Sequence, residues 1–491
     1  MADPQPQSPM WWLQKLEGEL HDRQPRLQLM DAYYRGDHPM PFLTKAHNAK
    51  MRDEFRQLLD DCRANYMRLV VDATEERMRV EGFRLSPDTD PVADAPSWKI
   101  WQASDMDSLS QAAFVEALVK EVSYLSVWFG DKTGDPPTIA VEDPTQTIVG
   151  YVPGSNYTKR AAALKIWLDD WTGLLRANVY MPDGIYKYQA PIDDKSSPGT
   201  YPQLAGTYGE AKPKWVDWQG GEAYLDNPVG IVPIIPLRNR PRVLCEGESE
   251  LIDVYRIQNQ INGFLFLLAL AGYFGAHKQR WAVGLKIMED SNGKPIEPFD
   301  VDAGKLWVAQ QGADGQDVKF GEFSQTDLSG YIKAIEQKVL QIVTTSRTPR
   351  HYLFQEGQSP SGDAIQSAES GLVKKVERKQ RDFGEALEET MALAMRFNGE
   401  QAPPVDSEIV WADPRTESPG VLTDAVIKQY AGGLIPWEAA LEKLGYSQTQ
   451  IQRFSKMRLS DALMKGVEAD QGVADPAPPA PVQVKGPIIR A

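Results

Sequence analysis

The chain of 491 residues has only two cysteines, Cys62 and Cys245. They lie far apart and not at the spacing of metal ligands, so neither a disulfide framework nor a cysteine zinc site is expected. Two free thiols are the ordinary state in a reducing compartment. The opening residues MADPQPQSPM lack a basic end followed by an apolar core, so no signal peptide is expected there.

Catalytic motifs are equally scarce. The five histidines are scattered and form no HExxH motif, and no GxSxG motif is present. Gly357 and Gly362 have the spacing of a phosphate loop, but Asp363 and Ala364 stand where Lys and Ser or Thr are required. The sequence therefore predicts no active site and no cofactor, which favours a structural or interaction protein.

Positive charge is in deficit. Lys and Arg number 53 against 68 Asp and Glu, giving a formal net charge of -15. Because Lys and Arg supply most non-specific affinity for DNA, this balance argues against a tight, general DNA binder. The charge balance does not exclude a protein along which DNA slides. The content of 42% hydrophobic and 25% charged residues is typical of a soluble globular protein, and the length predicts several domains.

One long run lacks charge altogether. A helix is predicted over 250–276, and Ile257 to His277 contains no Lys, Arg, Asp or Glu. The segment from Gly263 to Ala276 is almost wholly apolar. A membrane span needs about 20 predominantly apolar residues, and this helix carries Gln258, Asn259, Gln260 and Asn262. Burial against other helices or subunits is favoured, with membrane insertion as the alternative.

The rest of the chain is organised around residues 324–397. An amphipathic helix is predicted to begin near Ser324, with Asp327 completing a capping box, and to end near Ser346 because Pro349 disfavours helical geometry before it. A second helix, 363–397, would be roughly 50 Å long. The loop between them is long, and such loops are usually functional or mobile.

The second helix carries a basic run. Its members are Lys374, Lys375, Arg378, Lys379 and Arg381. The simplest interpretation is a solvated helix face.

The remaining elements follow from hydrophobic periodicity and turn signals. Helices are predicted over 11–29, 51–80 and 108–123, with residues 33–37 in a loop. Strands are predicted over 138–141, 147–152, 163–169 and 174–180, and short strands over 284–288, 305–309 and 318–320. Towards the end come a strand at 405–411, helices beginning at Pro419, Pro436 and Ser447, and a disordered Pro-rich tail from Gly472.

Five segments in order resemble one family. They are Tyr33 to Asp37 (YYRGD), Asn227 to Pro236, Glu246 to Asn262 (EGESELIDVYRIQNQIN), Thr345 to Gly384, and Trp411 to Gly445. Together they cover most of the chain, which resembles the portal proteins of tailed bacteriophages, in the group similar to the portal of Bacillus phage SPP1. The resemblance implies an α+β, mainly helical portal fold assembled as a cyclic ring of about twelve subunits.

The resemblance also implies a division of the chain. The expected parts are a disordered lead (1–10), an α+β wing (11–245), stem helix 1 (246–280), a β-containing clip (281–323), stem helix 2 (324–346), a tunnel loop (347–362), a long wing helix (363–397), a helical crown (398–466) and a disordered tail (467–491).

The implied function is the channel at one capsid vertex through which double-stranded DNA is packaged and ejected. The implied partners are the terminase large subunit, the head-completion adaptor, and coat and scaffolding proteins, with no membrane. The protein would assemble in the host bacterial cytoplasm and reside in the virion. The candidate residues of the DNA channel and tunnel loop are Arg347, Arg350, His351, Gln355, Glu356, Lys374, Lys375, Arg378 and Lys379. The basic members would make transient phosphate contacts, because few strong contacts let DNA slide along an acidic wall.

Three other functions remain open. A nuclease or ATPase of the packaging machinery would show metal-dependent cleavage or ATP turnover. A membrane pore would use residues 263–276 and need detergent. A major coat protein would assemble shells rather than rings, and the helix-β-helix insertion speaks against it.

Overall fold

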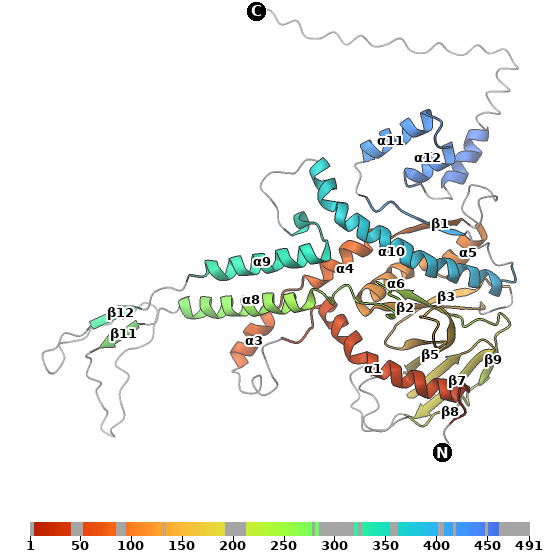
Figure 1. The fold of residues 1–491 in the computed structure, drawn as a ribbon, viewed down its shortest axis with the longest axis horizontal. Helices are drawn as coiled ribbons and strands as arrows, with labels where there is room; N and C mark the ends of the chain where they lie inside the picture. Colours follow the sequence, from red (N-terminus) through yellow and green to blue (C-terminus); the bar gives the residue numbers. More distant parts are fainter. Residues whose placement is uncertain are drawn as a thin grey trace, which may run out of the picture.

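The structure is a computed structural model. It describes residues 4–40, 53–84, 95–130, 132, 134–191, 213–276, 280–283, 319–322, 327–353, 362–400, 407–415, 419–446 and 450–460. Helices and strands form a mixed α+β body, and a helical hairpin projects from one side of it (Figure 1). The predicted α+β class is confirmed.

The lower part of the body is a helix on an antiparallel sheet. The strands β4 (Thr147–Tyr151), β5 (Arg160–Asp169), β6 (Leu174–Tyr180), β7 (Gly184–Pro191) and β8 (Val216–Asp217) pair in that order, and β9 (Tyr224–Asp226) also pairs with β7. Helix α1 (Pro9–Arg35) packs Leu13, Leu16 and Leu20 against the alternate inward residues of the sheet.

The upper part is layered around the long helix α10 (Gly362–Phe397). Its apolar stripe packs against the sheet β10–β2–β3 (Ile234–Arg238, Val122–Trp128, Thr138–Glu142) and against α5 (Ala95–Ala103) and α6 (Met106–Lys120). The rings of Phe114 and Phe383 stack at a centroid distance of 5.6 Å. Strands β1 (Val80–Arg84) and β13 (Glu408–Trp411) pair alongside.

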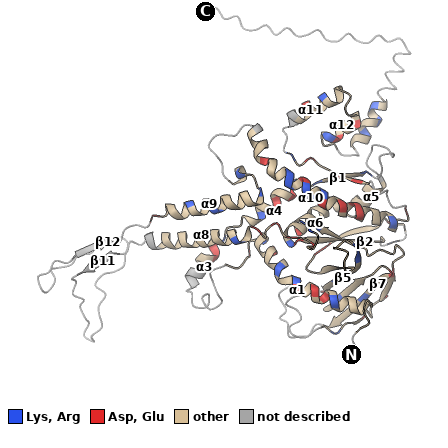
Figure 2. Ribbon diagram, in the orientation of Figure 1, with Lys and Arg blue, Asp and Glu red and all other residues tan. Residues whose placement is uncertain are grey.

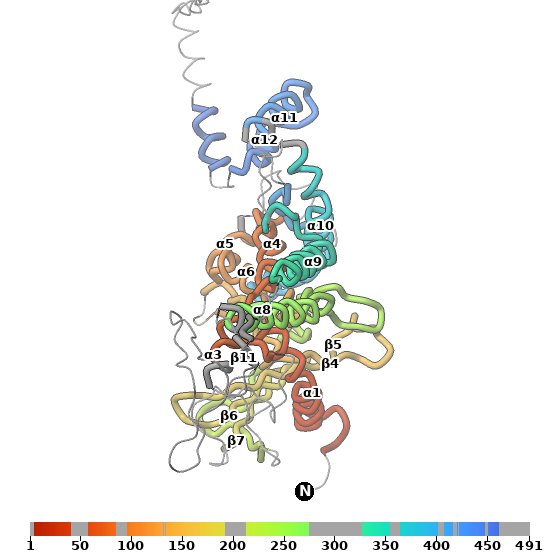
Figure 3. Tube along the Cα trace, turned by 90° about the vertical axis from the view of Figure 1, so that its left-hand side faces the viewer, coloured from red at the N-terminus to blue at the C-terminus, as the bar shows by residue number. Residues whose placement is uncertain are grey.

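The projecting hairpin consists of α8 (Tyr255–Ala276) and α9 (Ser329–Ser346), which lie side by side. Strands β11 (Arg280–Val283) and β12 (Lys319–Glu322) pair beyond their outer ends. At the root, Ile257 and Ile261 of α8 and Ile342 of α9 join a buried cluster with α1, α4 (Met67–Glu75) and α6. Figure 3 views the molecule with the hairpin towards the reader, and α10 lies on the opposite side from α5.

Other helical elements lie around this body. They are α3 (Asp53–Asp61), which contacts α8, the 3-10 turn η1 (Arg350–Tyr352) after α9, and the pair α11 (Pro419–Ala431) and α12 (Trp437–Lys443). Residues 450–460 are also helical. Arg84 of β1 and Glu442 of α12 form an ion pair at 2.7 Å.

Most of the strongly periodic predictions are confirmed. Strands β3 to β6 and helices α10, α11 and α12 lie where expected within one to three residues, and α9 ends at Ser346. The predicted strands 284–288 and 305–309, residue Ser324 and the tail lie outside the described residues.

Several boundaries are wrong. Helix α1 begins within the expected lead and continues to Arg35, so Tyr33 and Tyr34 are helical and only Gly36, at φ 87°, ends the helix. The single helix expected over 51–80 is broken into α3, α4 and the start of β1.

Both hairpin helices begin five residues later than expected, at Tyr255 and Ser329. Asp327 accepts hydrogen bonds from the backbone and side chain of Ser329, so this carboxylate caps the start of α9. Helix α5 and strand β10 were not predicted, because α5 begins in a Pro/Asp-rich segment and β10 lies within a Pro-rich one.

Candidate nucleic-acid interface

The polar residues of α8 all lie at its root. Asn262 accepts the backbone N–H of Ala64 at 3.1 Å, and Gln258 accepts that of Tyr66 at 3.0 Å. Asn262 also contacts Nε2 of the fully buried His38 at 2.7 Å. Burial lowers the pKa of His38 to about 4, so the imidazole is neutral and accepts this hydrogen bond. These side-chain amides therefore hold the root of α8 against residues 38–66 of the same chain.

Beyond Gly263, α8 has no charged residue and is only partly covered. Leu267 and Tyr273 of α8 are 46% and 51% exposed, and Ile332 of α9 is 48% exposed. Figure 2 shows α8 almost without coloured turns along its projecting length. Within the described segments, no helix is both long and apolar enough to span a membrane.

The end of α9 brings cationic residues against α10. Arg347 follows the last turn with φ 60°, an unusual conformation for a residue other than glycine, and its Cβ lies 3.9 Å from where a Cβ on Gly371 of α10 would stand. One helical turn later on α10 come Lys374 and Lys375, and then Arg378 and Lys379. The loop end and the basic run predicted from the sequence are thus neighbours in space.

Two of the four cationic residues on α10 point inwards. Lys375 and Lys379 are 8% and 2% exposed, and their ammonium groups lie 2.9 and 2.5 Å from the two carboxylate oxygens of Glu250. Lys379 also donates to Asn239, and Lys375 donates to the carbonyl of Ser346 at 3.3 Å. Burial alone would raise the pKa of Glu250, but the two ammonium groups outweigh it and hold that pKa well below its usual range.

This cluster, Glu250 with Lys375 and Lys379, is called the buried clamp. It joins three segments: the end of α9, the middle of α10, and residues 239–254, which connect β10 to α8. A cavity of about 170 Å³ opens above it. The cavity is lined by Arg240, Glu250, Asp253, Val254, Thr345, Ser346, Arg347, Lys375, Arg378 and Lys379. Both acidic residues of the lining are paired, Glu250 with the two lysines and Asp253 with Arg240 at 2.9 Å. The exposed rim of the cavity is therefore cationic.

A second ionic cluster holds the turn after α9. The guanidinium of Arg77 donates to the hydroxyl of Tyr352 at 2.7 Å and to the carbonyl of Pro414 at 2.8 Å. It also pairs with the buried Glu369 at 3.1 Å, and His351 lies 3.4 Å from the same carboxylate. Arg77 thereby connects the end of α4, η1, α10 and the segment after β13.

The predicted site residues thus have different positions. Arg347, Arg350, Lys374 and Arg378 are exposed, His351 is half-buried, and Gln355 and Glu356 lie outside the described residues. Lys375 and Lys379 face the protein interior, and the expectation that they meet phosphate directly does not fit this geometry. Sequence reasoning missed Arg240, Glu250 and Asp253, because only tertiary contact brings them to α10.

Catalytic geometry does not emerge in the part of the chain that the structure describes. No group of three or more His, Cys, Asp or Glu residues there could hold a metal ion. The described residues instead show an exposed apolar surface on α8 and a cationic rim where the hairpin meets the body, which suit a subunit of an assembly.

The comparisons identify the class as phage portal proteins. Residues 13–460 match the family described as phage portal protein, SPP1 Gp6-like. The portal protein of Mycobacterium phage D29 is 31% identical over 435 residues, which cover 84% of this chain and 82% of that protein. The portal protein of Mycobacterium phage L5 is 30% identical over 455 residues, covering 87% and 86%.

The chain belongs to the SPP1 Gp6-like family of phage portal proteins. It is a capsid component, and a role in genome packaging is inherent to the family. The resemblance inferred from the sequence is confirmed.

Proposed function

We propose that about twelve copies of this chain close into a ring whose bore passes double-stranded DNA during packaging and ejection. The observation that supports it best is the projecting α8–α9 hairpin. The outer half of α8 carries no charge, and Leu267 and Tyr273 of α8 and Ile332 of α9 are about half exposed. Exposed apolar surface of this extent indicates an interaction site, and neighbouring copies can cover it all around a closed ring.

In such a ring we assign to this chain the parts that the family implies. The hairpin forms the stem, residues 281–323 the clip, 347–362 the tunnel loop, and 398–466 the crown, with the wing outside. The clip is the site where the terminase large subunit docks during packaging and the head-completion adaptor docks afterwards. Coat and scaffolding proteins surround the ring during assembly in the host cytoplasm.

Imaging of the purified protein tests the ring. Electron micrographs and mass measurement should show end-on rings with a central hole and a mass of many subunits. A protein that stays a single subunit under every assembly condition, and that hydrolyses ATP or cleaves DNA, would instead support the packaging nuclease or ATPase.

We further propose that the exposed cations Arg347, Arg350, Lys374 and Arg378, with His351, make the transient phosphate contacts. Gln355 and Glu356 stay candidates of the same loop. Lys375 and Lys379 have a supporting role and do not contact phosphate. Through the buried clamp they hold α10 against the end of α9, which keeps Arg347 and Arg378 beside each other. The net charge of -15 keeps the remaining wall from holding DNA.

Charge reversal separates these roles. Arg347→Glu with Arg378→Glu should shorten the packaged DNA or impair its retention, because two phosphate contacts per subunit become repulsive. Lys99→Glu, an exposed lysine on α5, is the matched control and should package normally. If the double variant packages DNA of unchanged length and retains it, Arg347 and Arg378 do not contact DNA. That result would not contradict the proposed ring.

A further inference from the structure

Two loops lie side by side on the body: residues 152–159 between β4 and β5, and residues 239–247 after β10. They are called the paired loops. Arg238 donates to the carbonyl of Tyr157 at 3.0 Å, and Tyr151 donates to Glu246 at 2.7 Å, which joins one loop to the other. In Figure 3 the green and yellow segments at these positions leave the body together on the side of α10.

The tips of the paired loops are apolar. Val243 and Leu244 are 71% and 81% exposed, and Val152 on the other loop is 41% exposed. Val243 and Leu244 are the two central residues of a tight turn in which Arg242 and Cys245 exchange backbone hydrogen bonds of 3.0 Å. Two adjacent aliphatic side chains at a turn, where polar residues are usual, indicate a contact surface.

Both loops contain unusual backbone conformations. Asn156, Tyr157 and Arg240 have φ values of 49°, 64° and 53°, which residues with a Cβ adopt rarely. Gly247 packs so tightly that an added Cβ would stand 2.3 Å from the carbonyl oxygen of Glu121. Backbone strain of this kind persists where it serves function, and a preformed surface loses little entropy when it binds.

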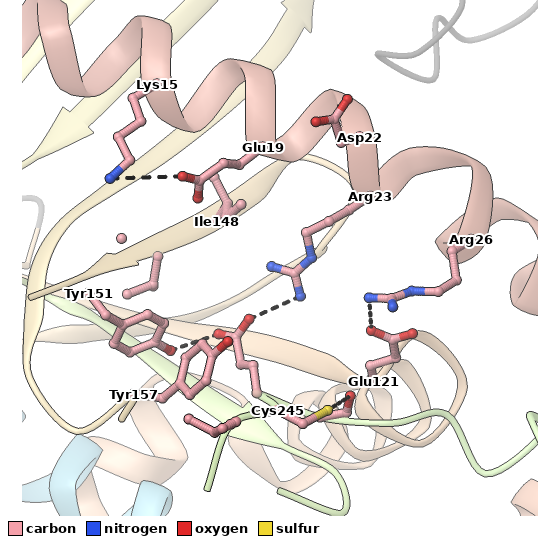
Figure 4. Close-up of a pocket in the computed structure, with 15 residues that line it drawn as sticks. Lys15, Glu19, Asp22, Arg23, Arg26, Glu121, Ile148, Tyr151, Tyr157 and Cys245 are labelled. Carbon is pink, nitrogen blue, oxygen red and sulfur yellow. Dashed lines mark hydrogen bonds and ion pairs between the residues drawn. The ribbon is translucent and has the colours of Figure 1, made fainter. Parts of the chain in front are cut away.

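The cavity beside the loops does not suit a small polar ligand. Figure 4 shows this space of about 530 Å³ between α1, β4 and the 239–247 loop. Four of its charged groups pair with each other: Arg23 with Glu246 at 3.1 Å, and Arg26 with Glu121 at 2.5 Å. None of its described lining residues has a buried polar side-chain atom without a partner. The exposed apolar tip beside it is instead suited to a protein surface.

We propose that the paired loops are a contact between neighbouring copies of this chain, with Val243 and Leu244 as its apolar centre. This inference rests on the proposed ring. Each copy carries a net charge of -15, so two copies repel one another and need a contact that is apolar and locally neutral. The tip meets that need, because Arg240 pairs with Asp253 and Arg242 with Glu248 around it.

The position of the loops agrees with a neighbouring copy. Residues 248–254 run directly from the 239–247 loop into α8, whose outer half is exposed and apolar. A copy that packs against the root of α8 would therefore also lie near the 239–247 loop. In a cyclic ring each copy meets its two neighbours through different flanks, so this one-sided patch matches a heterologous contact.

The first test is assembly of the double variant Val243→Ser/Leu244→Ser. Each interface should weaken roughly tenfold or more, because two aliphatic side chains are lost from its centre. Rings seen by mass measurement and micrographs should therefore give way to single subunits at protein concentrations where the unchanged chain is fully assembled. Leu434→Ser is the matched control, since Leu434 is 77% exposed on the loop between α11 and α12. Circular dichroism confirms that each variant is folded.

The outcomes are distinct. Loss of rings in the double variant, with rings retained by Leu434→Ser, supports the proposal. Equal assembly of the double variant and the unchanged chain, or equal loss in both variants, overturns it. If the unchanged chain forms no rings at all, the proposed function fails instead.

A photo-crosslink at position 244 identifies the partner. Benzoylphenylalanine replacing Leu244 in assembled rings should yield covalent dimers on illumination, with the second peptide mapped to another copy. The same group replacing Leu434 is the control for random collision. An absence of dimers above that control, or a crosslink in virions only to a coat protein, contradicts the proposed contact.

Discussion

Replacing Glu250 by Gln should destabilise the chain by about 3–5 kcal/mol. The carboxylate is 8% exposed and is shared by the ammonium groups of Lys375 and Lys379 at 2.9 and 2.5 Å. Removing one member of a buried ion cluster leaves the others charged and unpaired, which costs about 3–5 kcal/mol. Two lysines are left here, so the upper half of that range is expected.

Urea unfolding of the purified variant and of the unchanged chain measures this loss, at a concentration where light scattering shows the same assembly state. Glu248→Gln is the matched control. It lies two residues away and pairs with Arg242, whose side chain is 67% exposed, and exposed pairs contribute roughly 0–1 kcal/mol. A variant in which Leu replaces Glu250 and Met replaces both lysines should recover most of the loss, because an apolar group of similar volume is often neutral.

The pH dependence gives a second signature. The clamp holds the pKa of Glu250 below its ordinary 4.5, so its stabilisation is full above that pH and is lost as the pH falls through the folded-state pKa. The difference between the unchanged chain and Glu250→Gln should therefore shrink in acid. If Glu250→Gln stays within about 1 kcal/mol of the unchanged chain at neutral pH, as Glu248→Gln should, the clamp does not hold α10 to α9.

Three further predictions concern the root and the loops. The unchanged chain should lose about 2–3 kcal/mol of stability between pH 6.5 and about 4, because only the unfolded chain takes up a proton on His38 in that range. His38→Asn should remove this loss, and thermal melts at several pH values measure it. Gly247→Ala should cost about 1–3 kcal/mol through its clash with Glu121, whereas Gly221→Ala, with open space around it, should change the melting temperature little. Arg77→Met leaves Glu369 buried without its guanidinium, so hydrogen exchange should speed up at residues 350–353 and 413–415; unchanged exchange there would show that Arg77 does not connect these segments.

The parts of the fold that sequence predicted well are those whose pattern is local. Helix α10 repeats its apolar residues over 36 positions, and the strands β3 to β6 are short apolar runs, several of them separated by turn signals, so their own residues specify them. The break between α3 and α4 has a distant cause. Asn262 and Gln258, nearly two hundred positions away, bind the backbone N–H groups of Ala64 and Tyr66, which would otherwise continue a helix.

The candidate site shows the same division. Lys374, Lys375, Arg378 and Lys379 are alike in sequence, and the spacing placed them together on one helix. Which two face outwards depends on Glu250, which belongs to the segment between β10 and α8 and meets α10 only through tertiary contact. The charge run was therefore predictable as a feature, whereas the division between exposed and buried lysines was not.

Helix α8 shows why a portal subunit can be recognised from so little chemistry. Its polar residues are used inside the chain, since Gln258 and Asn262 fix the helix to residues 38–66. Its apolar half has no comparable cover among the described residues, with Leu267 and Tyr273 about half exposed. A single subunit that kept this surface in water would lose roughly 25 cal/mol for each Å² left uncovered. The same helix therefore specifies the fold through its amides, and in the proposed ring its uncharged outer half is the surface along which neighbouring copies would pack.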